Sequence, residues 1–173
     1  TIENADRILV LEEGRIVVRR SREGEKFVSL DGKERVLRPD TLMICDGVKP
    51  VAIGGVMGGL NSEVRPETET VLLESAYFDP ASIRRTARAL GMGTDAAFRF
   101  ERGIDPQGVV RALDRAARLI AEVSGGTVCA RAIDQHPRPV ETACDIPLRV
   151  RRVDDILGAA VPEGEMVQIL ERL

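Results

Sequence analysis

The stretch PVAIGGVMGGLNSEVRPETETVLLESAYFDPASIRRTARALGMGTDAAFRFERGIDP, residues 50–106, decides the fold of this chain. It predicts a strand, a glycine-rich loop, a second strand, a capped helix and a loop. The β-branched residues of Val51–Met57 favour the first strand. Gly54 and Gly55 would weaken that strand unless the backbone must approach another group closely, as it does in the wall of a pocket. A polar loop then runs from Gly58 to Glu69.

The second strand of this stretch ends in a carboxylate. Thr70–Leu73 is a short apolar run, which predicts a strand buried on both faces, and Glu74 follows it directly. A carboxylate at the end of a buried strand is costly unless another group donates hydrogen bonds to it. Glu74 therefore either has a structural partner, such as backbone amides or the side chains of Arg84, Arg85 or Arg99, or serves a ligand.

Two Asp-Pro pairs mark the expected helix starts. Asp79 is the predicted N-cap of a helix with Pro80 at its first position, and Gly91 is the predicted stop. Asp105-Pro106 repeats the start signal, and apolar residues then recur at three- and four-residue steps as far as Val123. The sequence therefore predicts two main helices, with Gly93–Ala96 between them as a compact turn.

The chain before residue 50 has a β-rich pattern. Strands are expected at Ile16–Val18, Lys26–Leu30, Glu34–Leu37 and Thr41–Cys45. Asp31-Gly32 and Asp46-Gly47 predict tight turns, and connections this short join antiparallel neighbours. The fold class that follows is α+β, with a mixed, mainly antiparallel sheet packed with two main helices.

The chain after residue 126 changes character twice. Thr127–Ile133 is expected to return as a strand, and the proline-containing stretch Asp134–Cys144 is a linker by composition. From residue 146 a short strand at Leu148–Val150, a helix near Val153–Leu157 and an amphipathic helix through Met166 predict a small helical module that is unfinished. The predicted domains are residues 1–14, an atypical segment, residues 15–145 and residues 146–173.

Composition narrows the class of protein. Hydrophobic residues make up 43% and charged residues 31% of the 173 residues, as in soluble globular proteins. Only 3% are aromatic, so a base-stacking platform would be poor. A net charge of −3 argues against a free-standing nucleic-acid binder, because phosphate affinity comes mainly from clustered Lys and Arg. A domain that receives one RNA end remains compatible with this charge.

The cysteines and the absence of targeting signals indicate a compartment. The three cysteines, Cys45, Cys129 and Cys144, lack CxxC spacing, which suggests neither zinc nor a disulfide framework. No apolar run has membrane-spanning length, and no signal peptide is evident. We expect a cytoplasmic protein that has no membrane partner.

Four motifs, at Val56–Gly59, Leu72–Pro80, Thr94–Ala96 and Arg99–Pro106, together resemble a known family. They are similar to the B3/B4 region of the β subunit of bacterial phenylalanyl-tRNA synthetases, which carries the editing site of those enzymes. The similarity extends from about Arg15 to the end of the chain, and residues 146–173 resemble the start of the next module, B5.

The resemblance implies part of an enzyme, a phenylalanine–tRNA ligase. This segment would hydrolyse tyrosine wrongly attached to phenylalanine tRNA and would not itself form aminoacyl-tRNA. The implied partners are the tRNA 3′ end carrying tyrosine and the synthetase α subunit in an α₂β₂ assembly, and DNA is not among them. The parent enzyme would use ATP and Mg²⁺, whereas no cofactor is expected in this segment.

The resemblance also implies an editing pocket formed by Gly58, Glu74, Thr94 and Ala96. Glu74 would accept a hydrogen bond from the tyrosine hydroxyl, and Gly58 would let a backbone amide approach the ligand. Thr94 would supply a hydroxyl, and Ala96 would leave room. Without the family, Gly58 is equally well a turn glycine with positive φ, and Thr94 an ordinary turn or cap residue. No metal ligand or catalytic side chain is implied, so a positioned water would do the hydrolysis with help from the tRNA's terminal hydroxyl.

Residues 1–14 depart from the family pattern. A His-Ala-Phe-Asp-like motif is expected there and is missing, and TIENADRILVLEEG resembles instead a segment of ABC-type ATPases, although no GxxxxGK[ST] loop accompanies it. A rival interpretation follows: a non-catalytic module that packs on the synthetase and guides tRNA, with weak or lost editing. His136, the single histidine, lies in the linker and is expected at the surface.

Overall fold

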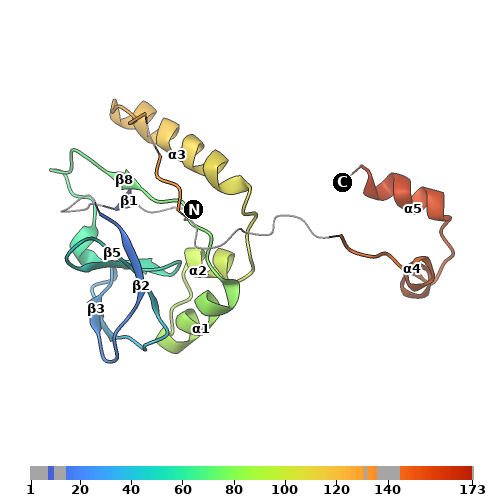
Figure 1. Cartoon of the computed structure of the whole chain (residues 1–173), viewed down its shortest axis with the longest axis horizontal. Helices are drawn as coiled ribbons and strands as arrows, with labels where there is room; N and C mark the ends of the chain where they lie inside the picture. The colour runs from blue at the N-terminus through green and yellow to red at the C-terminus, as the bar shows by residue number, and fades with distance from the viewer. Residues whose placement is uncertain (1–7, 10–14, 131, 136–144, 173) are drawn as a thin grey trace. The chain divides into compact units, whose positions relative to one another are not determined.

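The computed structural model describes residues 8–9, 15–130, 132–135 and 145–172. The chain divides into two compact units, Thr1–Val140 and Glu141–Leu173 (Figure 1), and each is described by itself below. This division lies close to the predicted boundary between residues 145 and 146. The predictions made for His136 and Cys144 lie outside the described residues.

The strands of the first unit form antiparallel sheets. The four-stranded sheet has the order β2-β5-β6-β7, with β2 at Val17–Arg20, β5 at Leu42–Cys45, β6 at Pro50–Ile53 and β7 at Met57–Gly58. Two further pairs are β3 (Lys26–Val28) with β4 (Glu34–Val36) and β1 (Ile8–Leu9) with β8 (Leu72–Leu73). Together with the helices, these sheets confirm the α+β fold class.

The predicted strand Val51–Met57 is wrong in its extent, because the chain reverses within it. β6 ends at Ile53, and β7 pairs back onto it with Ala52 opposite Gly58. Gly55 has φ +65°, a left-handed conformation that favours glycine. The close approach expected at the glycines does occur, but the neighbours are core side chains: a Cβ on Gly55 would lie 2.7 Å from Ile83 Cδ1 and 2.9 Å from Phe78 Cδ2.

Three helices follow the sheet in the first unit: α1 (Pro80–Leu90), α2 (Asp95–Phe100) and α3 (Gly108–Ser124). The predicted caps of α1 are confirmed, since Asp79 Oδ1 accepts a hydrogen bond from Ser82 N at 2.6 Å and Gly91 has φ +63°. α3 starts two residues later than predicted, because the Asp105 carboxylate instead accepts a hydrogen bond from Gln107 N in a turn before the helix. The helix α2 was not predicted.

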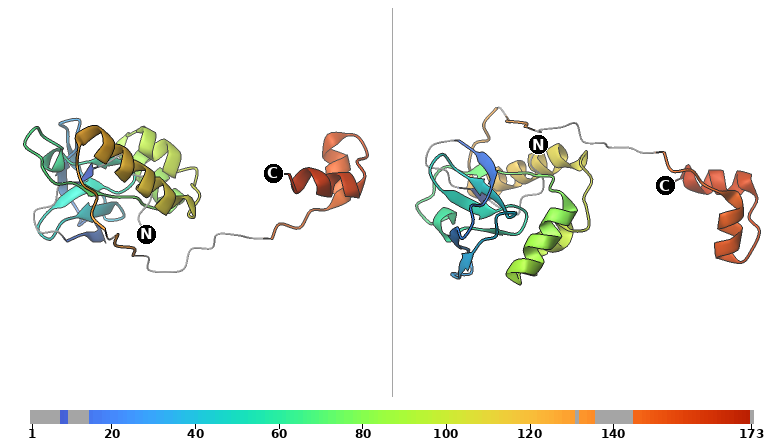
Figure 2. Two further views of the ribbon diagram at one scale, coloured as in Figure 1. Left: turned by 90° about the horizontal axis from the view of Figure 1, so that it is seen from above. Right: turned by 60° about the horizontal axis from the view of Figure 1, so that its bottom comes forward.

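The core of the first unit lies between the four-stranded sheet and the first two helices, which pack beside it (Figure 2). Met43, Ile53 and Ile83 are among its fully buried side chains. Phe78, just before α1, meets Phe100 of α2 edge to face, with ring centroids 4.8 Å apart, a geometry that aromatic rings prefer. The core thus ties the β6–β7 hairpin to the segment before α1 and to α2.

Three other expectations about extended segments are corrected. Thr70–Leu73 forms a strand only at Leu72 and Leu73, and both are half-buried, because β8 pairs with β1 in a two-stranded sheet. The described part of Thr127–Ile133 contains no strand. Leu148–Val150 is not a strand either, since Val150 is the first residue of a helix.

The second unit contains two helices, α4 (Val150–Leu157) and α5 (Glu163–Leu170). Gly158 ends α4 with φ +69°, as predicted, and Asp154 Oδ1 accepts a hydrogen bond from Val161 N at 2.9 Å. Met166 is buried, but Ile156 and Leu170 remain 69% and 52% exposed. No helix in the described part of the chain has both the length and the apolar character needed to cross a membrane.

Candidate functional site

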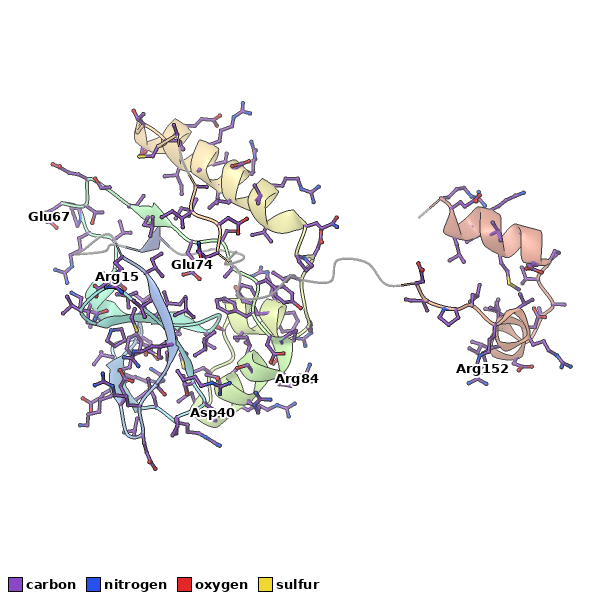
Figure 3. The ribbon with its side chains drawn as sticks, in the orientation of Figure 1. Arg15, Asp40, Glu67, Glu74, Arg84 and Arg152 are labelled. Atoms are coloured by element: carbon purple, nitrogen blue, oxygen red, sulfur yellow. The ribbon has the colours of Figure 1, made fainter. Side chains whose placement is uncertain are left out.

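Glu74 lies on the connection between β8 and α1, and it is buried, with 9% of its surface exposed. Figure 3 places it in the interior of the first unit. Its neighbour Ser75 donates a hydrogen bond to Val109 O at 3.1 Å, which ties this connection to α3. Glu74 itself makes at least one hydrogen-bonding or electrostatic interaction within the chain. A ligand hydroxyl would therefore join or replace an existing partner.

Thr94 is the N-cap of α2 and also ties this helix to the sheet. Its Oγ1 accepts a hydrogen bond from Ala97 N at 3.1 Å and donates one to Val56 O at 2.8 Å. The first bond caps the N-terminus of α2, so Thr94 is a cap residue, which was the alternative interpretation of Thr94 from the sequence. A hydroxyl oxygen has two acceptor sites, so one can still accept a hydrogen bond from a ligand.

Gly58 lies in β7 and does not have a positive φ, so the turn-glycine alternative is wrong at this position. Its carbonyl accepts a hydrogen bond from Leu30 N at 3.0 Å. A Cβ at Gly58 would lie 3.0 Å from Leu30 Cδ1, which is closer than side chains normally pack. Glycine therefore permits the close approach of the Leu30 side chain.

Ala96 is in the first turn of α2, where it is half-buried and packs against the core. A larger residue here would have to displace core side chains or extend toward solvent. Asp95, before it, is exposed, and Ala97, after it, is buried. Ala96 therefore lies at the margin of the core, and its role in lining a pocket stays a prediction.

The turn at Gly54–Val56 is where the elements that carry the predicted residues meet. Thr94 bonds to the carbonyl of Val56, two residues before Gly58. Phe78, on the same connection as Glu74, lies so close to Gly55 that a Cβ there would clash with it. These contacts link α2 and the segment around Phe78, four residues after Glu74, to the turn before Gly58, and they do not by themselves place Glu74 beside the other three residues. Sequence reasoning missed this turn, and only the Gly54-Gly55 pair indicated it.

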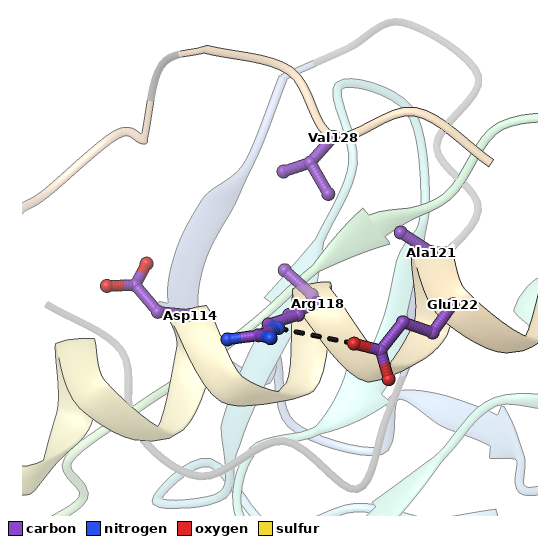
Figure 4. Close-up of a pocket in the computed structure, with 6 residues that line it drawn as sticks. Asp114, Arg118, Ala121, Glu122 and Val128 are labelled. Carbon is purple, nitrogen blue, oxygen red and sulfur yellow. Dashed lines mark hydrogen bonds and ion pairs between the residues drawn. The ribbon is translucent and has the colours of Figure 1, made fainter.

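A separate hollow of about 430 Å³ lies along α3 (Figure 4). It is lined by Asp114, Ala117, Arg118, Ala121, Glu122 and Val128. Its polar side chains are exposed Asp114 and a solvent-exposed ion pair between Arg118 Nε and Glu122 Oε1, 3.2 Å apart. None of the four predicted site residues lines this hollow. Because its polar side chains are exposed to solvent and two of them already pair with each other, it offers a poor site for a specific small ligand.

A close ion pair lies elsewhere, between Arg19 of β2 and Glu25. Arg19 donates two hydrogen bonds to Glu25, at 2.6 and 2.8 Å, and these lower the pKa of Glu25 to about 2. Burial raises the pKa of the nearby Cys45 thiol, which keeps it protonated and unreactive. None of these three residues is among the four predicted site residues.

The described residues include no group of three or more His, Cys, Asp or Glu side chains that could hold a metal ion. Cys45 is buried on β5 and Cys129 is exposed after α3, and both thiols are free. The chemistry that the predicted site residues can offer is therefore that of a buried carboxylate, Glu74, and that of the Thr94 hydroxyl.

The chain is similar to curated proteins along most of its length. It is 70% identical over 163 residues to the phenylalanine–tRNA ligase beta subunit of Syntrophus aciditrophicus, covering 94% of this chain and 20% of that protein. Identity to proteins of the same name is 53% over 155 residues in Salinibacter ruber (90% of this chain, 19% of that protein) and 51% over 164 residues in Geobacter metallireducens (95% and 20%). The chain thus spans about a fifth of the length of the curated relatives it matches.

A family model also matches the chain. The model described as B3/4 domain matches residues 1–125, which include residues 1–14 and all four predicted site residues. The match ends just after α3, before the proline-containing linker. Because this match covers well over half of the 173 residues, the chain belongs to the B3/4 domain family.

Proposed function

We propose that this chain is the editing part of a phenylalanine–tRNA ligase β subunit, where it hydrolyses tyrosine wrongly attached to phenylalanine tRNA. The observation that carries the proposal is a carboxylate, Glu74, that is only 9% exposed on the connection between β8 and α1. Burying a carboxylate costs free energy, which an interaction of Glu74 within the chain offsets, and a carboxylate has further acceptor sites that can serve a ligand. The shared name of the relatives supports the parent enzyme.

Selection of tyrosine follows from the chemistry of that carboxylate. The phenol of tyrosine would donate a hydrogen bond to an acceptor site of Glu74 beside the partner that this carboxylate already has within the chain, whereas a phenylalanine ring would cover that acceptor site without offering a donor. An unsatisfied buried acceptor costs about 1–3 kcal/mol. A site built around a hydroxyl therefore rejects the ligand that lacks it. An apolar pocket rejects a ligand with an added hydroxyl much less strongly.

The remaining residues would shape the pocket. Gly58, beside which the Leu30 side chain packs closely, would let a backbone amide approach the ligand, and half-buried Ala96 would leave space at the start of α2. Thr94 holds α2 against the β6–β7 turn through its bond to Val56 O and keeps one acceptor site for the ligand. These groups would fix the amino acid rather than react with it.

Hydrolysis would need no covalent intermediate on the protein. The oxygen of a bound water attacks the carbonyl carbon of the aminoacyl ester, and the bond from that carbon to the ribose oxygen breaks. The ribose oxygen takes up a proton, leaving free tyrosine and uncharged tRNA. The neighbouring ribose hydroxyl of the tRNA positions the water, so the rate gain comes from orientation and from donors aimed at the developing oxyanion.

The rest of the parent protein would supply the aminoacylation. That reaction needs ATP, Mg²⁺, phenylalanine and the α subunit, and it would take place in the cytoplasm. The residues described here offer no metal-ligand cluster, so we assign none of them to Mg²⁺ or ATP.

A second candidate is favoured by one observation, the missing His-Ala-Phe-Asp-like motif in residues 1–14. In that case the module would pack within the synthetase and guide tRNA without hydrolysing the ester. The two candidates differ in whether tyrosine is released faster than the spontaneous rate.

The experiment uses phenylalanine-specific tRNA that carries either tyrosine or phenylalanine. It compares how fast the wild-type chain and Glu74→Ala release each amino acid. Editing predicts faster release of tyrosine by wild type and a loss of that preference in Glu74→Ala. Equal background rates for both proteins would favour the guiding module. The same assay is run in the full-length subunit, so that weak tRNA binding by the 173-residue chain cannot hide hydrolysis.

Ala96→Trp tests the pocket independently of Glu74. The indole would fill the space at the start of α2, so hydrolysis should stop while thermal unfolding remains cooperative. Unchanged hydrolysis in this variant would show that Ala96 does not line the pocket.

A further inference from the structure

The outward side of α1 carries three arginines, and this helix contains no acidic residue. Arg84, Arg85 and Arg88 are all exposed, while Ile83 and Ala87 on the inner side are buried. At about 100° per residue, the three arginines occupy one arc of about 100° on the helix surface. Their charges therefore lie next to one another.

The end of α2 extends this positive surface. Arg84 Nη2 donates a hydrogen bond to Glu101 O at 2.8 Å, which places Arg84 beside the end of α2 (Figure 3). Arg102 follows and stacks on the ring of Phe98, 3.5 Å from its centroid, and Phe98 is 58% exposed. The one carboxylate at this position, that of Glu101, already pairs with Arg102 at 2.9 Å.

This surface has an unusual charge balance for the chain. Among the described residues, no carboxylate forms an ion pair with Arg84, Arg85 or Arg88. Like charges three and four residues apart on a helix repel each other and destabilise it. The whole chain has a net charge of −3, so the concentration of arginines here is local. A polyanionic partner would remove the repulsion.

We propose that the arginine face, defined as Arg84, Arg85, Arg88 and Arg102, binds the phosphate backbone of RNA. The inference rests on the proposed function, because the tRNA is the polyanion that this function brings to the domain. Guanidinium groups match phosphate oxygens in a two-pronged geometry. Arg102 already stacks on Phe98 and pairs with Glu101, so Arg84, Arg85 and Arg88 supply the positive charge of this face that no carboxylate neutralises among the described residues.

The test measures how the binding of tRNA without an attached amino acid to the 173-residue chain depends on salt concentration. Binding is followed by fluorescence anisotropy. Each phosphate contact contributes about 0.7–0.9 to the slope of log affinity against log salt. The double variant Arg85→Gln/Arg88→Gln should therefore lower the slope by about 1.4–1.8. The matched control is Arg111→Gln/Arg115→Gln on α3, where the exposed arginines flank Asp114, and it should keep the wild-type slope.

Several outcomes would overturn the inference. One is that wild type shows no salt-dependent binding of tRNA. Another is that the α1 double variant keeps the wild-type slope, or that the slope falls equally in the α3 control. Polyglutamate that binds as tightly as tRNA, with the same dependence on Arg85 and Arg88, would assign the face to an acidic protein instead. Glu74→Ala should bind tRNA with the wild-type slope. A failure of editing with the slope intact would therefore refute the proposed hydrolysis and leave the arginine face standing.

Discussion

Replacing Thr94 with valine removes a hydroxyl that makes two hydrogen bonds at once, to Val56 O at 2.8 Å and from Ala97 N at 3.1 Å. Loss of the N-cap bond costs about 1 kcal/mol, and loss of the bond to the β6–β7 turn costs about 1 kcal/mol more. Thr94→Val should therefore lower the free energy of unfolding by about 2 kcal/mol. For a unit spanning Thr1–Val140, an unfolding entropy of roughly 0.3 kcal/mol/K turns this loss into a fall of about 7 °C in Tm.

The assay is thermal unfolding of the 173-residue chain followed by circular dichroism, with Thr94→Ser as the matched variant. Serine keeps the hydroxyl and both bonds, so its Tm should stay within about 2 °C of wild type. A Thr94→Val variant as stable as wild type would refute the linking role of the hydroxyl. A Thr94→Ser variant as unstable as Thr94→Val would show that the methyl group, and not the hydroxyl, stabilises the contact.

Two further predictions concern stability. The hydrogen bonds from Arg19 lower the pKa of Glu25 from 4.5 to about 2, so the stabilisation is complete above pH 4.5 and is lost as the pH falls toward 2. With solvent screening allowed for, the loss should be about 1–2 kcal/mol in urea titrations, and Glu25→Gln should abolish this pH dependence. Gly55→Ala should cost about 3 kcal/mol of unfolding free energy, because it combines a left-handed φ with a clash against Ile83. Gly91→Ala, with φ +63° and open space, should cost only about 1 kcal/mol in the same chemical denaturation series, and equal losses would refute the clash.

Local signals predicted much of the fold. The caps of α1 at Asp79 and Gly91 and the turn at Gly32, which has φ +74°, depend on residues close together in sequence. The helix α2 was missed because its six residues are too few to show a helical period, although Thr94 followed by Asp95 is an N-terminal signal. The β6–β7 turn was missed because β-branched residues on both sides of Gly54 and Gly55 resemble one continuous strand.

The candidate site was predictable only in part, because some of its contacts join residues that are far apart in the sequence. Glu74 is buried, as its place after an apolar run suggested, although Leu72 and Leu73 of that run are only half-buried. The bond from Thr94 to Val56 joins residues 38 positions apart, and no local pattern encodes it. The role of Gly58 likewise depends on the Leu30 side chain, which reaches it from the β3–β4 hairpin. Contacts of this kind arise from packing of the whole unit.

The central claim is that Glu74 selects the phenol hydroxyl, and calorimetry of binding tests it most directly. The ligands are tyrosyl and phenylalanyl analogues of the tRNA 3′ terminal adenosine joined by an amide, which is not hydrolysed. Wild type should bind the tyrosyl analogue about 5- to 150-fold more tightly, as a hydrogen bond worth about 1–3 kcal/mol requires, and Glu74→Ala should bind both equally. Equal affinities in wild type, or a tyrosyl preference that survives in Glu74→Ala, would contradict the claim.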